Sequence, residues 1–314
     1  MGKATRDAYG ETLKILGSEY PDIVVLDADL AKSTKTAEFK KLFPSRFFDT
    51  GIAEQNMMGV AAGLAAAGKL PFASTFAIFG AGRAYEQIRN SICYPRLNVK
   101  IAVTHAGLTV GEDGATHQML EDIALMRVLP NMTVTVPADA AETAAILRWA
   151  VSYQGPVYIR MGRAKCEDLT NPERPFVPGK ASVIREGADM TFIACGVTVA
   201  MAAAASDRLR QRGISARVLN MSSIKPIDRE AVLRAARETG AIVTCEEHNM
   251  LGGLGGAVSE VTSAEYPVPV RRVGTQDTFG ESGTADALLQ KYGITPGHME
   301  QEAELVLTMK KRFS

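Results

Sequence analysis

The stretch that decides the fold is Val99-Lys-Ile-Ala-Val103, which runs through Thr104 into the loop His105-Ala-Gly-Leu-Thr-Val-Gly-Glu-Asp-Gly-Ala-Thr-His-Gln118. Its residues form a mostly apolar run instead of alternating with polar ones, which indicates a strand buried on both faces. Such strands belong to parallel sheets covered by helices, and the loops that hold ligands follow the C-terminal ends of these strands. We therefore expect an α/β fold with a ligand site in the 105–118 loop.

The same rhythm extends over the first half of the chain. Strand-like runs at 23–26, 132–136 and 157–160 alternate with segments of helical spacing near 5–19, 54–67, 82–92, 117–128 and 139–153. The rhythm lapses around 164–180, where Pro172, Pro175 and Pro178 fall within seven residues and exclude a regular element. We predict a domain at 1–165 and a linker at 166–180.

Beyond the linker the α/β pattern resumes. Strand-like runs at 191–195, 216–219 and 241–245 accompany a helical segment near 198–212. A run at 268–271 is predicted to be an edge strand, because Pro269 cannot donate a hydrogen bond to a neighbouring strand. The sequence thus predicts two α/β/α domains, the second at 181–314.

The composition excludes several classes of protein. Thirty-five basic and 35 acidic side chains cancel, so no overall field draws the chain to nucleic acid or to anionic lipid, and we expect neither as a partner. The N-terminus lacks an apolar signal core and no apolar stretch is long enough to span a membrane, which predicts a cytoplasmic protein. The four cysteines form no Cys-x-x-Cys pair and are predicted to be buried free thiols: Cys93, Cys166, Cys195 and Cys245.

A carboxylate opens a helix that is otherwise apolar or small, in Gly51-Ile-Ala-Glu54-Gln-Asn-Met-Met-Gly-Val-Ala-Ala-Gly-Leu-Ala-Ala-Ala67. A solvated acid that complements the helix dipole is one interpretation of Glu54. The alternative follows from the lack of a polar face, which predicts that the helix is buried and Glu54 with it. A buried carboxylate needs a partner, and a ligand nitrogen is one candidate.

The 105–118 loop holds His105 and His117, two of the chain's four histidines, beside Asp113 and three glycines that allow close backbone approach. Surface histidines and a metal site are the alternatives, but the spacing and ligand set match no recognised zinc or iron pattern. We therefore predict a catalytic or binding role for the loop and no metal ligands in this chain.

Aromatic and basic residues supply further candidates. Phe76 and Phe79 form either part of the core or an apolar slot for a planar heterocycle. Four arginines are candidate anion clamps or ordinary structural residues: Arg6, Arg83, Arg160 and Arg163. The glycine-rich 252–256 segment lacks the Gly-x-Gly-x-x-Gly spacing and is predicted to be a tight turn into a helix.

Three motifs in series resemble the C-terminal half of transketolases. They are Gly51-Ile-Ala-Glu-Gln-Asn56, Ser74-Thr-Phe-Ala-Ile-Phe79 and Gly111-Glu-Asp-Gly-Ala-Thr-His-Gln118, in the order and at the distances of that family. The similarity continues through 120–127 and the second domain. The resemblance implies a thiamine-diphosphate pyrimidine-binding domain followed by a transketolase C-terminal domain.

The resemblance also implies roles for individual residues. Glu54 matches the glutamate that hydrogen-bonds the cofactor's pyrimidine nitrogen, with Phe76 and Phe79 beside the ring and Asp29 near the thiazolium. The remaining matches face the sugar phosphate: Arg6, Ser33, His105, Asp113, His117 and Arg163. His105 and His117 are the implied proton-transfer groups. The segment Gly80-Ala-Gly82 departs from the family by one additional residue before Arg83 and by a missing third aromatic.

The family holds the diphosphate and Mg²⁺ through a Gly-Asp-Gly segment followed by Asn, and this chain has no Gly-Asp-Gly. We therefore expect a partner subunit that carries this site, in an assembly of two copies of each chain that is active only when complete. The expected reaction moves a two-carbon ketol unit from a ketose phosphate to an aldose phosphate.

Two alternatives remain. A chain like deoxyxylulose-phosphate synthase or the β subunit of a 2-oxo-acid dehydrogenase would start from a 2-oxo acid, and a non-catalytic subunit would retain the fold alone.

Overall fold

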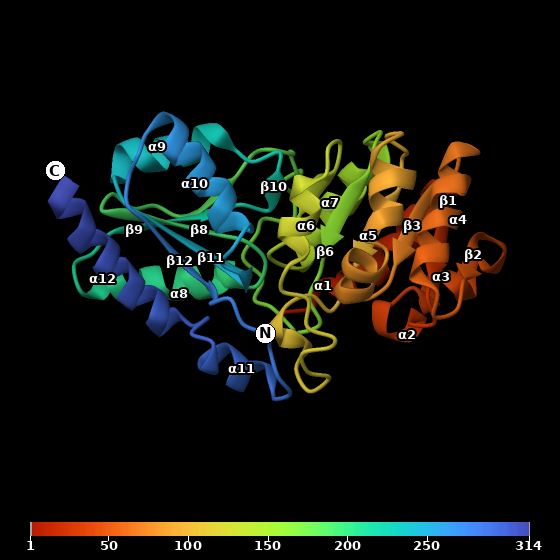
Figure 1. The fold of residues 1–314 in the computed structure, drawn as a ribbon, viewed down its shortest axis with the longest axis horizontal. Helices are drawn as coiled ribbons and strands as arrows, with labels where there is room; N and C mark the ends of the chain where they lie inside the picture. Colours follow the sequence, from red (N-terminus) through yellow and green to blue (C-terminus); the bar gives the residue numbers. More distant parts are fainter. Residues whose placement is uncertain (1, 314) are drawn as a thin grey trace.

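The computed structural model describes residues 2–313 and contains two parallel-rich α/β units that lie side by side (Figure 1). The first is built on a seven-stranded sheet of order β10-β5-β6-β4-β3-β1-β2, parallel except for β10. Its strands are β1 (Ile23–Asp27), β2 (Phe47–Asp49), β3 (Leu70–Ser74), β4 (Lys100–Val103), β5 (Thr133–Thr135), β6 (Val157–Arg160) and β10 (Ser223–Lys225).

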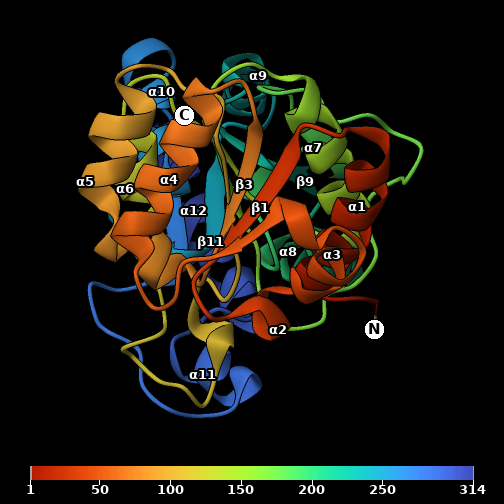
Figure 2. The same cartoon turned by 90° about the vertical axis from the view of Figure 1, so that its right-hand side faces the viewer.

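Helices cover both faces of this sheet (Figure 2). One face carries α1 (Thr5–Glu19), α3 (Ala37–Leu42) and α7 (Ala140–Ser152), and the other carries α4 (Glu54–Ala66), α5 (Tyr85–Gln87) and α6 (Asp122–Val128). Shorter elements complete the unit: α2 (Ala31–Thr34), η1 (Pro44–Arg46), η2 (Ile78–Arg83), η3 (Ile88–Cys93) and η4 (Leu108–Val110). The predicted strand at 99–103 is β4, fully buried, at the centre of the sheet.

The second unit has a five-stranded sheet of order β12-β11-β8-β9-β7, parallel except for β7. Its strands are β7 (Ser182–Arg185), β8 (Met190–Ala194), β9 (Ala216–Asn220), β11 (Ile242–Asn249) and β12 (Val270–Thr275). Helices α8 (Thr198–Gln211) and α12 (Pro296–Phe313) cover one face, α9 (Arg229–Thr239) and α10 (Leu254–Glu265) the other, and α11 (Ala285–Lys291) lies below (Figure 1). The predicted edge strand at 268–271 is β12, which lies at the edge of the sheet but begins at Val270, so that Pro269 precedes the strand and is not part of it.

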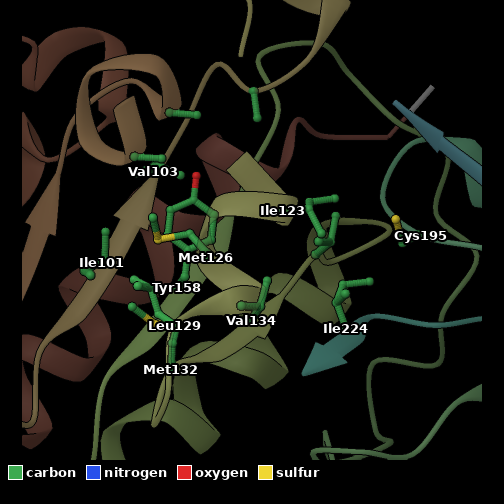
Figure 3. Close-up of a cluster of buried hydrophobic side chains, with 14 of the residues drawn as sticks. Ile101, Val103, Ile123, Met126, Leu129, Met132, Val134, Tyr158, Cys195 and Ile224 are labelled. Carbon is green, nitrogen blue, oxygen red and sulfur yellow. The ribbon is translucent and has the colours of Figure 1, made fainter. Parts of the chain in front are cut away.

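The two units share a core. Strand β10, from the segment predicted to belong to the second domain, pairs antiparallel with β5 and completes the first sheet. One cluster of buried side chains continues from Ile101 and Tyr158 across Ile123 to Cys195 and Ile224 (Figure 3). Burial of apolar surface is the main favourable term in folding, so this shared cluster holds the two units in a fixed arrangement.

Two helix predictions are wrong in detail. The segment 117–128 is helical only from Asp122, because 117–121 belongs to the loop that follows β4. The segment 82–92 is not one helix, since two π-helical stretches, η2 and η3, flank the single turn of α5. Wider π-helical turns re-aim side chains and are frequent at functional sites.

Helix α4 is buried on one face only, which corrects the prediction of a fully buried helix. Glu54, Met57 and Met58 are buried, as predicted for Glu54, but Gly59 and Gly63 lie on an open face where an added Cβ would meet no atom within 4 Å. The sequence of α4 does not show which face packs inward, because small apolar residues occur on both of its faces.

Two smaller predictions, on the cysteines and on the 252–256 segment, are confirmed. All four cysteines are free and buried. The glycine-rich 252–256 segment is a turn into α10, where Gly252 has a positive φ of 77°. Within residues 2–313, no helix is long and apolar enough to cross a membrane.

Candidate active site

The candidate residues gather where the parallel strands end. Phe76 follows β3, His105 follows β4, and an isolated parallel bridge joins Phe76 to Thr104. Arg6 stands in the first turn of α1, whose start at Ala4 is bridged to Lys165 beyond β6. Because parallel strands end on the same edge of a sheet, residues far apart in sequence meet there.

An aromatic stack forms the centre of the site. The rings of Phe76 and His105 are stacked with centroids 3.7 Å apart, and Phe76 stacks on Phe79 at 5.9 Å. His117 meets the edge of Phe79 at 5.4 Å. The two phenylalanines and two histidines predicted from sequence therefore form one contiguous group of rings. Stacked and edge-on ring contacts of this kind are favourable.

His105 is held in an unusual backbone conformation. Its φ is +57°, a left-handed geometry that residues other than glycine rarely adopt and that often marks functional sites. Its Nε2 lies 3.1 Å from Nη1 of Arg6, and its Nδ1 lies 2.7 Å from Oγ1 of Thr104. An arginine can only donate, so Nε2 accepts and the proton belongs on Nδ1.

The surroundings keep His105 neutral. Burial, followed by the charges of Arg6 and Arg163, lowers the pKa of His105 to about 3. The hydrogen bonds and the lowered pKa both indicate a neutral imidazole whose Nε2 lone pair is directed at the guanidinium of Arg6. In this arrangement Nε2 of His105 can accept a proton only after the hydrogen bond from Arg6 to that nitrogen has broken.

Arg6 and Arg163 line a cavity of ≈ 330 Å³, together with Thr109, Glu112 and Ala285. Arg6 donates to the backbone oxygen of Ser33 at 3.1 Å, while its buried Nε has no hydrogen-bond partner. Burial lowers the pKa of the Arg6 guanidinium, and Arg163 adds to that effect. Two cations beside a small cavity, one with an unsatisfied donor, suit an anion such as a phosphate.

Arg163 is already partly engaged. Its Nη1 donates to Glu112 at 2.9 Å and to the backbone oxygen of Val110. Arg160, in contrast, lies in the interior on Asp122 and is not an anion clamp. A larger cavity, of ≈ 430 Å³, lies at the linker around Leu169 and Phe176, away from these residues.

Glu54 is 1% exposed at the start of α4, and its Oε2 accepts a 2.7 Å hydrogen bond from Nη1 of Arg83. Among the described residues this is its one side-chain hydrogen bond. The guanidinium of Arg83 also lies 4.6 Å from the centroid of Phe79. Arg83 is therefore the partner of Glu54 in this chain, a contact that sequence reasoning missed.

These contacts join six predicted residues into one group, the site cluster: Arg6, Glu54, Phe76, Phe79, His105 and His117. Three other predicted residues are not joined to this group by the side-chain contacts above. Ser33 meets Arg6 only through its backbone oxygen, and Asp113 is exposed in the turn at 111–114. Asp29 is exposed after β1, with a φ of +62°.

Several residues that support the site gave no clear signal in the sequence. Asp49 accepts the backbone N–H groups of both Asp29 and Gly51, at 3.1 Å each, and so braces two loops. Asp27, at the end of β1, is buried and bonded to Thr34 and Thr36, and burial raises its pKa to about 6. The one signal in the sequence is that both aspartates stand at the ends of strands, β1 for Asp27 and β2 for Asp49.

The site cluster fits the pyrimidine end of thiamine diphosphate. Glu54 offers a buried carboxylate with a single, half-exposed partner, and the rings of Phe79 and Phe76 lie beside that partner. For the metal the residues do not suffice, since residues 2–313 contain no group of three or more His, Cys, Asp or Glu that could hold an ion.

The fold and the site cluster define a two-domain α/β protein with a candidate site at the strand ends of its first sheet, and comparison with known proteins shows its family. Residues 1–167 match the family model of the transketolase pyrimidine binding domain, and residues 179–299 match that of the transketolase C-terminal domain. The chain belongs to the transketolase family, whose enzymes depend on thiamine diphosphate.

Individual relatives match over nearly their whole length. The chain is 50% identical over 295 residues to the "Putative transketolase C-terminal section" of Methanocaldococcus jannaschii, covering 93% of this chain and 92% of that protein. It is 43% identical to the 6-deoxy-6-sulfo-D-fructose transketolase subunit of a Clostridium species, with 98% and 95% covered. A solved structure described as a split gene transketolase, inactive beta4 tetramer, superposes with a TM-score of 0.93 at 59% identity, with 98% and 100% covered.

Proposed function

We propose that this chain is the C-terminal subunit of a split, thiamine-diphosphate-dependent transketolase that moves a two-carbon ketol unit from a ketose phosphate to an aldose phosphate. The observation that carries the proposal is the continuous line of contacts from Glu54 through Arg83, Phe79, Phe76 and His105 to Arg6. It links a buried carboxylate for a heterocycle to a cation for a phosphate within one site.

Each part of the site cluster has a role in this proposal. Glu54, Phe76, Phe79 and Asp29 hold the cofactor, which when bound supplies the nucleophilic carbon that takes up the two-carbon unit. The buried carboxylate of Glu54 orients the pyrimidine ring through a hydrogen bond. Phe76 and Phe79 fix the plane of that ring by aromatic contact.

The sugar phosphate occupies the opposite end of the cluster. Arg6 and Arg163 bind its phosphate, with Ser33 beside them. Asp113, His105 and His117 hold its hydroxyls, and the two histidines move protons, a contribution typically worth about 10²–10⁴-fold. A phosphate at Arg6 would draw the guanidinium away from Nε2 of His105 and free that nitrogen to accept a proton.

The proposal requires a partner. We propose that a second chain carrying Gly-Asp-Gly followed by Asn holds the diphosphate and Mg²⁺, in a cytoplasmic assembly of two of each subunit. Magnesium needs several oxygen ligands in octahedral geometry. The relative that is described as an inactive β4 tetramer supports the idea that copies of this chain alone associate without activity.

Reconstitution tests the proposal. The purified chain is mixed with the partner, thiamine diphosphate and Mg²⁺, and transfer is followed from xylulose 5-phosphate to ribose 5-phosphate. We expect turnover with both chains and none with either alone. Release of carbon dioxide from pyruvate by the complete assembly would favour a 2-oxo-acid enzyme instead. A complex that forms but is inactive on both would favour a non-catalytic subunit.

A further inference from the structure

The 105–118 loop carries both site histidines, yet it is held in place from the second unit. The backbone N–H of Thr109 donates to Oε1 of Glu247 at 2.5 Å, across 138 residues of sequence. Glu247 lies near the end of β11, outside the site cluster. This is a direct bond from a side chain of the second unit to the backbone between the two histidines.

The fit at this point is close. A Cβ added to Gly107 would lie only 2.3 Å from Cδ of Glu247, so the carboxyl group is packed against the bare Cα of the residue two after His105. Gly107 has a φ of +83°, which L side chains rarely adopt. The backbone path of the loop and the position of the Glu247 carboxyl group therefore depend on each other.

Neighbouring contacts follow the same pattern. Nε2 of Gln118 donates to the backbone oxygen of Glu281 at 2.9 Å. The backbone N–H of Asn249 donates to the backbone oxygen of Leu120 at 2.8 Å. Leu108 packs with Leu288 and other apolar residues of the second unit. The loop is thus fastened at its start and at its end, and Glu247 holds the part next to His105.

Burial of Glu247 costs free energy, because its carboxyl group is removed from water. Glu247 is 4% exposed, and burial raises the pKa of its carboxyl group to about 6, although the nearby Arg160 charge opposes that rise. An apolar side chain of similar size would avoid this desolvation. Because the buried carboxylate loses hydration energy and its hydrogen bond is to a loop backbone, we infer that its role is to position that loop.

We propose that Glu247 is a positioning residue: by holding the backbone of Gly107 to Thr109 it fixes His105 and His117 for the sugar substrate. The second unit thereby controls the substrate step of the first. This inference rests on the proposed function for the identity of the substrate, whereas the mechanical link itself concerns only this chain.

Two substitutions separate the possible roles of Glu247. Glu247→Met keeps the length of the side chain and removes the acceptor, while Glu247→Gln keeps an acceptor oxygen and removes the charge. Glu246→Met is the matched control. Glu246 is equally buried on the same strand, but its carboxylate accepts the N–H groups of Leu254 and Gly255 at the start of α10.

Hydrogen exchange on the chain alone gives the first readout. Glu247→Met should increase amide exchange in the 105–118 loop and leave 254–265 unchanged, and Glu246→Met should do the reverse. Glu247→Gln should behave close to wild type. Unchanged exchange in the 105–118 loop of a folded Glu247→Met variant, or equal loosening in the control, would overturn the inference.

Kinetics of the reconstituted complex give the second readout. Small misplacement of catalytic groups can cost about 10²-fold in rate. We expect Glu247→Met to lower kcat/KM for the sugar phosphates by about 10- to 100-fold, with thiamine diphosphate affinity unchanged and Glu247→Gln restoring most of the loss. Wild-type transfer with an unaffected Glu247→Met would reject the positioning role. Absent wild-type transfer would instead reject the proposed function and leave the exchange result to decide the mechanical link.

Discussion

Two buried carboxylates in this chain each pair with an arginine, and they differ in how completely they are satisfied. Asp122 is 0% exposed; its two oxygens share the Nε–H of Arg160, at 3.0 and 2.8 Å, and Oδ2 also accepts the hydroxyl of Tyr158 at 2.7 Å. Glu54 is 1% exposed and receives one bond from Arg83, whose side chain is 47% exposed. Protein donors reach both oxygens of Asp122, whereas only Oε2 of Glu54 has a side-chain partner among the described residues. We call the first the closed pair and the second the open pair.

The difference teaches how to separate a structural pair from a functional one. Arg160 also donates to the backbone oxygens of Met119 and Glu247, so the closed pair ties the end of β6 to both units. Such a pair has no capacity left for a substrate. The Glu54–Arg83 pair keeps hydrogen-bonding capacity beside the ring of Phe79, which a heterocycle can use.

The largest expected effect is on turnover at the open pair. Glu54→Ala should remove nearly all transfer activity of the reconstituted enzyme, because the hydrogen bond to the cofactor's ring is lost. Its free energy of unfolding should fall by only about 1 kcal/mol, the usual worth of an acid in the first turn of a helix. Steady-state kinetics and chemical denaturation measure the two quantities. The control Gln55→Ala changes the exposed next residue, and retention of most activity by Glu54→Ala would contradict the assignment.

At the closed pair the expected effect is on stability. Asp122→Ala leaves the buried guanidinium of Arg160 without its counter-charge, and removal of one partner from a buried pair typically costs about 3–5 kcal/mol. Urea denaturation of the isolated chain measures this loss. Lys69→Ala, which breaks an exposed pair with Asp22, should change the stability by less than about 1 kcal/mol. Equal losses in the two variants would remove the distinction between the closed pair and a surface pair.

Phosphate binding should depend more on Arg6 than on Arg163. Arg6 has an unsatisfied buried donor, whereas Arg163 already pairs with Glu112. A charged hydrogen bond is worth about 1.5–3 kcal/mol, so Arg6→Met should raise KM for sugar phosphates by about 10- to 100-fold. Arg163→Met should have the smaller effect. The reverse order, measured with the same donor and acceptor, would place the phosphate elsewhere in the cavity.

The last prediction concerns the titration of His105. Because its pKa in the folded chain lies near 3, below the ordinary value of about 6.5, the unfolded chain binds the extra proton first. His105 should therefore reduce stability progressively as the pH falls from about 6.5 toward 3. NMR titration of the imidazole should find it neutral down to pH 5, and Arg6→Met should raise its pKa. A wild-type His105 that titrates near pH 6.5 would contradict this.

Much of the fold could be predicted from the sequence because it depends on local patterns. The apolar run before His105 predicted the central strand β4, and the position of Pro269 predicted an edge strand. The helix at 117–128 was placed too early, because the helical spacing does not show that the residues after His117 are drawn into a loop held by Met119 and Gln118. The open face of α4 was missed because small residues pack equally well on either side.

Residue types and their spacing in the sequence determined which groups this protein offers: Glu54 at a helix start, rings after one strand, and two histidines after the next. Only the tertiary structure decided which of them meet. Arg83 reaches Glu54, Arg160 turns inward to Asp122, and Glu247 comes to Thr109 from the other unit. These contacts depend on the order of the strands in the sheet and on how helices and strands pack together. Local sequence preference does not determine which residues far apart in the chain come into contact.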